Sequence, residues 1–278
     1  FPNVLMLSGK KGIGKYTIIK HFLSYVYDKE NYDLKSNIIS DQTIFFKQFS
    51  NNIYPNIIYL SGSDFLKIKI DDIRNLKSMI LKSASLNKER FIILDDIELF
   101  NTSSLNALLK IIEEPTINNY FVLINSKTRS LVETISSRAL EVRISLTNKM
   151  RVNIIKSLVE KNNLEVFIDY KTSNLSPGNF IIFNKICEIN KIDPDESFIL
   201  NLNKLLNLFK KNKDLEFINM MLYLTNIFFY NLQNKDKDKI EKIMKNKDFV
   251  IDNINKFITY NLNQTSLINA INSKLLNE

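Results

Sequence analysis

Three glycines near the start of the chain constrain its fold more than any other feature. Gly9, Gly12 and Gly14 lie in a stretch of six residues, although the 278-residue chain contains only five glycines. They follow a short apolar run at residues 4–7 and precede a helical pattern of apolar side chains. A glycine-rich turn between a strand and a helix lets successive backbone N–H groups converge on phosphate oxygens at the positive end of the helix. The pattern therefore predicts a phosphate-binding loop whose Lys15 reaches the outer phosphates, with a plain tight turn as the alternative.

Short apolar runs alternate with amphipathic stretches through the first half of the chain. The runs typical of buried strands are residues 4–7, 56–60, 91–94, 120–124 and 140–144. Strands of this length separated by helices imply parallel pairing, and therefore an open α/β sheet. Ligands bind such sheets at the carboxyl ends of the strands, which is where the glycine cluster lies.

From about residue 147 the strand patterns stop and helical patterns replace them. Two short helices are expected at residues 150–159 and 177–189, the second opened by the turn Ser176-Pro177-Gly178. Longer helical patterns follow at residues 198–209, 215–232, 240–244 and 251–276. We expect three parts: an α/β domain at 1–146, a small helical module at 147–190 and an all-helical domain at 191–278. All six arginines lie in the first 151 residues, which supports a boundary there.

Composition excludes several classes of site and of protein. With His21 and Cys187 as the only histidine and cysteine, the chain cannot assemble a zinc site or a nucleophile–histidine couple. Its apolar runs are too short to span a bilayer and no signal peptide opens it, so we expect a cytoplasmic protein with no membrane partner. A net charge of +8 permits a nucleic-acid partner.

Two positions beside the glycine cluster bear on its chemistry. Phosphate loops of this kind carry Ser or Thr after the lysine to hold magnesium, but Tyr16 stands here, and Thr17 points about 100° further around the helix. The strand at residues 91–94 delivers Asp95 to its carboxyl end, where Asp95 could hold magnesium. Asp96 stands where a hydrolytic enzyme carries the Glu that orients water. Two acids that only end a strand are the alternative.

The order of these motifs resembles the AAA+ clamp-loader family. After the loop come Asp95-Asp96, then LNALLKIIEEP at residues 105–115, FVLINS at 121–126 and SRA at 137–139. The resemblance covers residues 4–145 and extends over 148–189 as a lid module, and it implies a parallel-sheet P-loop (AAA+) domain, a helical lid and an all-helical collar domain. Within the family, Tyr16 and Asp96 are most similar to the delta-prime branch of bacterial DNA polymerase III.

The resemblance also assigns roles to single residues. Ser126 matches the sensor-1 position, and Arg138 matches the arginine finger that one subunit offers to ATP bound by its neighbour. A guanidinium supplied in this way stabilises charge on a transferring phosphoryl group. A cation at a helix C-terminus facing water is the alternative for Arg138. The sensor-2 arginine is replaced by Asn179, and the four-cysteine zinc module of the family is absent, so no metal site is expected.

We therefore expect a largely non-hydrolysing clamp-loader subunit that offers Arg138 to a neighbour. It would join gamma/tau and delta subunits in a hetero-pentamer that opens a sliding clamp at primed DNA. ATP or ADP with magnesium is the ligand that its own loop would take, poorly or statically, and the nucleotide-binding residues would be Gly9, Gly12, Gly14, Lys15, Tyr16, Thr17, Asp95, Asp96 and Ser126.

Other readings stay open. Arg74 and Lys77, on a helix expected at residues 70–82, are candidates for contacts with DNA phosphates, and a solvated helix face is the alternative. The chain could also be the ATP-hydrolysing motor subunit of the same loader, of the gamma/tau type. An unrelated P-loop nucleotide kinase is the third possibility, although kinases usually bring more arginines to their substrate phosphates.

Overall fold

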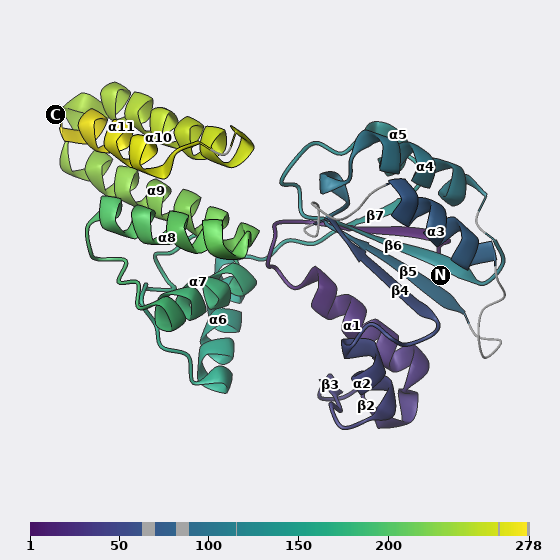
Figure 1. The fold of residues 1–278 in the computed structure, drawn as a ribbon. Coiled ribbons are helices and arrows are strands. Elements are labelled where there is room, and N and C mark those ends of the chain that lie inside the picture. The colour runs from purple at the N-terminus through teal and green to yellow at the C-terminus, as the bar shows by residue number, and fades with distance from the viewer. Residues whose placement is uncertain (63–69, 82–88, 115, 261, 277–278) are drawn as a thin grey trace. The chain divides into compact units, whose positions relative to one another are not determined.

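The computed structural model describes residues 1–62, 70–81, 89–114, 116–260 and 262–276 (Figure 1). The chain divides into two compact units. The first consists of Phe1–Ile154 together with Ser176–Asn179, and the second of Ile155–Leu175 together with Phe180–Glu278. The three-part division expected from the sequence stays a prediction.

The first unit is built on a five-stranded parallel sheet. Its strands are β1 (Val4–Ser8), β4 (Ile57–Ser61), β5 (Arg90–Asp95), β6 (Asn119–Asn125) and β7 (Leu140–Arg143), in the order β4-β5-β6-β1-β7. Every neighbouring pair is parallel, and the register places Ser8 opposite Asn125 and Arg143. The carboxyl ends of the strands therefore share one edge. The predicted parallel α/β sheet is confirmed, and each predicted run matches a strand to within one residue at either end.

Helices cover both faces of this sheet (Figure 1). On one face lie α1 (Lys15–Tyr27) and α2 (Ile44–Ser50), and on the other lie α3 (Ile70–Leu81), α4 (Thr102–Glu113) and α5 (Glu133–Ser136). Successive strand residues alternate between the two cores: Ile93 packs with the α1 layer, whereas Ile92 and Leu94 pack with the α3 layer. Burial on both faces is the reason that these strands read as continuous apolar runs.

The segment between α1 and β4 folds into elements that the sequence patterns did not predict. A two-stranded antiparallel hairpin, β2 (Tyr32–Asp33) and β3 (Ile38–Ile39), precedes α2. Thr43 caps α2, because its side chain accepts a hydrogen bond of 3.1 Å from the backbone N–H of Phe46. Phe45 and Phe49 of α2 are buried, and they pack in the same core as the apolar side chains of α1.

The second unit is helical. It contains α6 (Asn148–Asn162) from Ile155 onward and α7 (Pro177–Asn190) from Phe180 onward, followed by α8 (Phe198–Asn212), α9 (Leu215–Lys235), α10 (Ile240–Tyr260) and α11 (Gln264–Leu276). Its core includes Leu205, Met221, Val250 and Ile271. No helix in the described ranges is long and apolar enough to cross a membrane.

Two predicted helix boundaries in this unit are wrong. The expected interruption after residue 244 does not exist, because Ile243, Asn246 and Val250 continue one buried face of α10. The expected helix at 251–276 is instead divided, and its second part, α11, begins at Gln264. Asn263 caps that start, since its Oδ1 accepts a hydrogen bond of 3.1 Å from the N–H of Ser266.

Candidate functional site

The glycine cluster forms the loop that the sequence predicts, between β1 and α1. Gly12 (φ +79°) and Gly14 (φ +98°) both adopt the left-handed region, and Gly14 caps the start of α1. The N–H of Gly9 donates a hydrogen bond of 3.1 Å to the carbonyl of Asn125, which fixes the start of the loop to the end of β6. The loop therefore lies at the carboxyl edge of the sheet, the edge at which ligands bind in folds of this kind.

Lys15 is held by the loop itself. Its ammonium Nζ donates to the carbonyls of Gly9 (2.7 Å) and Lys10 (3.0 Å), and only 4% of the residue is exposed. Burial lowers the pKa of Lys15, while the nearby charges of Asp95 and Asp96 oppose that shift. Two of the three donors of this ammonium are thus already hydrogen-bonded to backbone oxygens.

A turn from a distant part of the chain packs on this loop. Ser176–Asn179 belongs to the first unit. The Ser176 hydroxyl donates to the carbonyl of Lys11 (2.6 Å), and the Gly178 N–H donates to the carbonyl of Gly12 (2.7 Å). A Cβ placed on Gly12 would lie 2.4 Å from Ser176 Oγ and 2.6 Å from Asn179 Oδ1. Asn179 therefore lies directly against the loop.

Two tyrosines, Tyr16 and Tyr59, lie near the first carboxylate, Asp95. The hydroxyl of Tyr59 on β4 donates a hydrogen bond of 2.9 Å to Asp95 Oδ2, and the N–H of Asp96 donates to Oδ1 (2.9 Å). The ring centroids of Tyr16 and Tyr59 are 5.3 Å apart. Burial, and then the charge of Asp96, raises the pKa of Asp95, and burial with the charge of Asp95 raises the pKa of Tyr16 to about 12. Both oxygens of the expected magnesium ligand are thus already hydrogen-bonded within the protein.

The second carboxylate joins the loop to the end of β6. Asp96 is buried and has a left-handed backbone (φ +48°). Its Oδ1 accepts a hydrogen bond of 2.7 Å from the Ser126 hydroxyl, and its Oδ2 lies 3.8 Å from the ammonium of Lys11. The structure therefore brings Asp96 and Ser126 together, whereas Thr17 is exposed on α1. Their part in nucleotide binding stays a prediction.

Glu98 is a buried carboxylate that the sequence reading did not single out. It lies in the 3-10 turn Ile97–Leu99 and is only 5% exposed. Its oxygens accept hydrogen bonds from the backbone N–H groups of Ser126 and Thr128 and from the Thr128 hydroxyl. The partners lie 28 and 30 residues away, so no local spacing indicates them.

Arg138 follows α5 and is partly exposed. Its Nε and Nη2 lie 2.9 Å and 2.6 Å from Glu113 Oε1, and its Nη1 donates to the carbonyl of Thr134 (2.8 Å). About a third of its side chain is accessible, at 37%. A surface pair of this kind contributes little stability, so its main effect is to fix the direction of the guanidinium.

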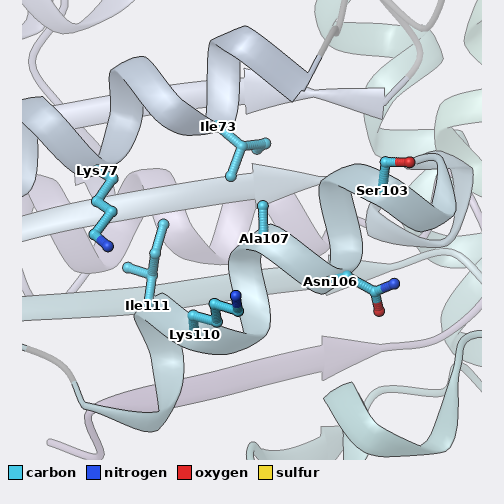
Figure 2. Close-up of a pocket in the computed structure, with 7 residues that line it drawn as sticks. All are labelled: Ile73, Lys77, Ser103, Asn106, Ala107, Lys110 and Ile111. Atoms are coloured by element: carbon cyan, nitrogen blue, oxygen red, sulfur yellow. The ribbon is translucent and has the colours of Figure 1, made fainter.

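Lys77 lines a pocket of about 430 Å³ between α3 and α4. Figure 2 shows Ile73 and Lys77 of α3 facing Ala107 and Ile111 of α4. The other lining residues are Ser103, Asn106 and Lys110. The backbone of Arg74 is part of α3, but its side chain lies outside the described residues. DNA contact by Arg74 and Lys77 stays a prediction. In the described parts of the chain, no group of three or more His, Cys, Asp or Glu side chains could hold a metal ion.

Comparison with known proteins adds a family to this geometry. The model of the family described as "DNA polymerase III, delta subunit" matches residues 1–148, which include every strand of the sheet, the glycine loop and Arg138. The match therefore covers more than half of the chain.

Curated relatives carry the names of two kinds of subunit. The DNA polymerase III subunit gamma of Buchnera aphidicola subsp. Acyrthosiphon pisum is 25% identical over 58% of this chain and 43% of its own length. The subunit delta' of Buchnera aphidicola subsp. Schizaphis graminum is 26% identical over 64% and 55%. A solved gamma subunit-related protein from Thermotoga maritima is 19% identical, with a TM-score of 0.48, over 98% and 94%. The chain spans about half the length of the curated relatives it matches.

Proposed function

This chain belongs to the clamp-loader family described as DNA polymerase III, delta subunit, and from that membership we propose that it works in DNA replication as a clamp-loader subunit of the delta-prime kind. In this proposal it assembles with gamma/tau and delta subunits into a hetero-pentamer, which opens a sliding clamp at primed DNA. Its own phosphate loop is largely inert, and Arg138 serves a neighbouring ATPase subunit.

The proposal rests on one observation: the loop and its lysine already make hydrogen bonds within the protein. Lys15 bonds to the carbonyls of Gly9 and Lys10, and the turn Ser176–Asn179 packs on Gly12 through two hydrogen bonds. A nucleotide phosphate would have to compete with the carbonyls of Gly9 and Lys10 for the lysine. This favours a loop that keeps its conformation for structural reasons and no longer binds or hydrolyses nucleotide efficiently.

The residues at this site do not fit a magnesium-bound nucleotide. Magnesium requires oxygen ligands in near-ideal octahedral geometry. Tyr16 offers a phenol whose pKa is raised to about 12 and whose ring packs against Tyr59. Asp95 already accepts hydrogen bonds at both oxygens. No catalytic step is therefore assigned to this chain's own loop.

Arg138 is the group that we assign to catalysis. It is exposed, always charged and oriented by Glu113 and the carbonyl of Thr134. In the assembly it would exchange the Glu113 carboxylate for the phosphate oxygens of ATP bound by a neighbour. There it stabilises the negative charge that develops during phosphoryl transfer.

A motor subunit of the gamma kind is the second candidate, because gamma subunits stand among the curated relatives and Lys15 is retained. Tyr16 and the Tyr59–Asp95 hydrogen bond count against it. Magnesium-dependent ATP turnover by the purified chain alone at about 1 per second, an ordinary enzyme rate, would establish the motor role.

ATP turnover by a reconstituted loader tests the role of Arg138. We expect Arg138→Ala to lower turnover by about 1000-fold, the usual effect of removing an arginine finger, without preventing assembly. Arg143→Ala is the matched control, since Arg143 is also an exposed arginine paired with a glutamate, Glu141, and should leave turnover unchanged. Full turnover by an intact Arg138→Ala assembly would reject the finger.

A further inference from the structure

The connection from β6 to α5 contains a small anion-binding concavity, and the protein fills it with one of its own carboxylates. Ser126 N–H lies 3.1 Å and 3.2 Å from the two oxygens of Glu98, and Thr128 N–H lies 3.2 Å from Oε1. The Thr128 hydroxyl donates to the same Oε1 at 2.8 Å. Backbone N–H groups that converge on one anion in this manner form a nest.

The residue in the middle of the nest has an unfavourable backbone. Lys127 has φ +56°, a left-handed conformation that costs a non-glycine residue free energy. Its N–H donates to Asn125 Oδ1 at 2.8 Å, while its two neighbours donate to Glu98. The three successive N–H groups are therefore all held by side-chain oxygens, and the carboxylate of Glu98 supplies the charge that makes its bonds strong.

This short segment links two parts of the proposed machinery. At its start, the hydroxyl of Ser126 donates to Asp96 beside the glycine loop. A few residues after its end comes α5, and then Arg138. A change in the conformation of Lys127 would change the path of the chain between Ser126 and Arg138. The hydrogen-bond partners of Glu98 are Ser126 and Thr128 rather than Arg138, so any effect of Glu98 on the position of Arg138 passes through this segment.

We propose that Glu98 is a positioning residue, which fixes the Ser126–Thr128 segment so that α5 presents Arg138 in the geometry the neighbouring ATP requires. The proposal rests on the role of Arg138 given above. It goes beyond it by naming the buried group that determines where the guanidinium lies. It also assigns a function to Glu98, which its position in a buried 3-10 turn does not itself indicate.

Three variants of the full chain test the proposal, each mixed with gamma- and delta-type subunits. Glu98→Ala should lower kcat for ATP by about 10- to 100-fold with KM nearly unchanged, because misplacing a catalytic group by about 1 Å has an effect of that size. Glu98→Gln keeps the size and one acceptor oxygen and should restore most of the activity. Ile97→Val, a mild change at a fully buried neighbour in the same turn, should leave kcat unchanged.

Amide hydrogen exchange of the isolated chain gives a second, independent readout. In Glu98→Ala the N–H groups of Ser126 and Thr128 should exchange about 10-fold faster or more, because each loses a charge-assisted hydrogen bond. If Arg138→Ala has no effect on turnover, the proposed function fails, while the exchange rates still show whether Glu98 holds the segment. If Arg138→Ala abolishes turnover but Glu98→Ala, with faster exchange, leaves kcat unchanged, positioning by Glu98 is overturned. Should Glu98→Ala fail to fold, Glu98→Leu takes its place, because it removes both acceptor oxygens and keeps most of the bulk of the side chain. Faster exchange with unchanged kcat in Glu98→Leu would overturn positioning equally.

Discussion

Tyr59 shows how one hydroxyl can alter a phosphate-loop site. It lies on β4 and donates a hydrogen bond to Asp95, which is 36 residues away at the end of β5. Burial raises the pKa of Asp95, so the ionised carboxylate costs folding free energy, and the Tyr59 bond offsets part of that cost. The hydroxyl also takes one of the acceptor positions of Asp95 Oδ2, one of the oxygens that could hold a metal.

Removing this hydroxyl should give a pH-dependent loss of stability. In Tyr59→Phe the pKa of Asp95 rises further, so at pH 7 the free energy of unfolding should fall by about 1–2 kcal/mol. A group whose folded pKa is raised favours folding below its unfolded pKa, and that contribution is lost as the pH rises through the folded pKa. The difference between variant and parent should therefore shrink as the pH falls below the pKa of Asp95.

Urea unfolding at several pH values measures this effect. Tyr27→Phe is the matched control, because the Tyr27 hydroxyl donates to the backbone carbonyls of Asn56 and Glu89 rather than to a carboxylate. Its loss should not vary with pH over the same range. A Tyr59→Phe loss that is equally independent of pH would show that the bond to Asp95 does not set the charge state of that residue.

At the same scale, the sequence identified some site residues and missed others. Lys15, Asp96 and Ser126 could be predicted because each occupies a fixed place in a motif at the end of a strand or loop. Tyr59 and Glu98 could not, since their contacts depend on which strands become neighbours. The signals that remain for these two are a polar group in an apolar strand and an acid beside a buried turn.

Among the elements, the close approach of the glycine loop and the turn Ser176–Asn179 is the most specific contact. Gly12 and Gly178 meet backbone to backbone, and a Cβ on Gly178 would lie 2.9 Å from the carbonyl oxygen of Gly12. Glycine is required at both places for space, and at Gly12 also for its left-handed backbone.

Two alanine substitutions separate these requirements. Gly12→Ala and Gly14→Ala both place a side chain on a left-handed backbone, but only the first meets the turn, because no heavy atom lies within 4 Å of a Cβ on Gly14. We expect Gly14→Ala to lower the free energy of unfolding by about 1 kcal/mol and Gly12→Ala by about 2–4 kcal/mol. Thermal or urea unfolding measures both. Equal losses would mean that the turn does not pack on the loop in solution.

The elements that the sequence predicted well are those whose pattern of buried residues is regular. The five strands are covered on both faces, which produces apolar runs, and the amphipathic helices follow them. The hairpin β2–β3 and α2 were missed because their strands have two residues each and α2 has seven, too short for a periodic pattern. The break before α11 depends on the Asn263 cap, a single residue among many asparagines.

At the scale of the whole molecule, the proposed function is that of a subunit that acts on its neighbours. The phosphate loop keeps its strand–loop–helix geometry, while Lys15 bonds to carbonyls of the loop and the turn Ser176–Asn179 packs on Gly12. Arg138 remains exposed on the surface of the same unit. A scaffold of this kind needs its loop to fold and its arginine to be presented, and it needs no nucleotide of its own.

The central claim is therefore tested most directly by comparing two substitutions in one reconstituted assembly. ATP turnover is measured with Lys15→Met, which keeps the length of the buried side chain, and with Arg138→Ala, after co-elution shows that both variants assemble. We expect Lys15→Met to leave turnover within about twofold of the parent and Arg138→Ala to lower it by about 1000-fold. Loss of turnover with Lys15→Met and full turnover with Arg138→Ala would contradict the account and assign this chain to the hydrolysing subunits.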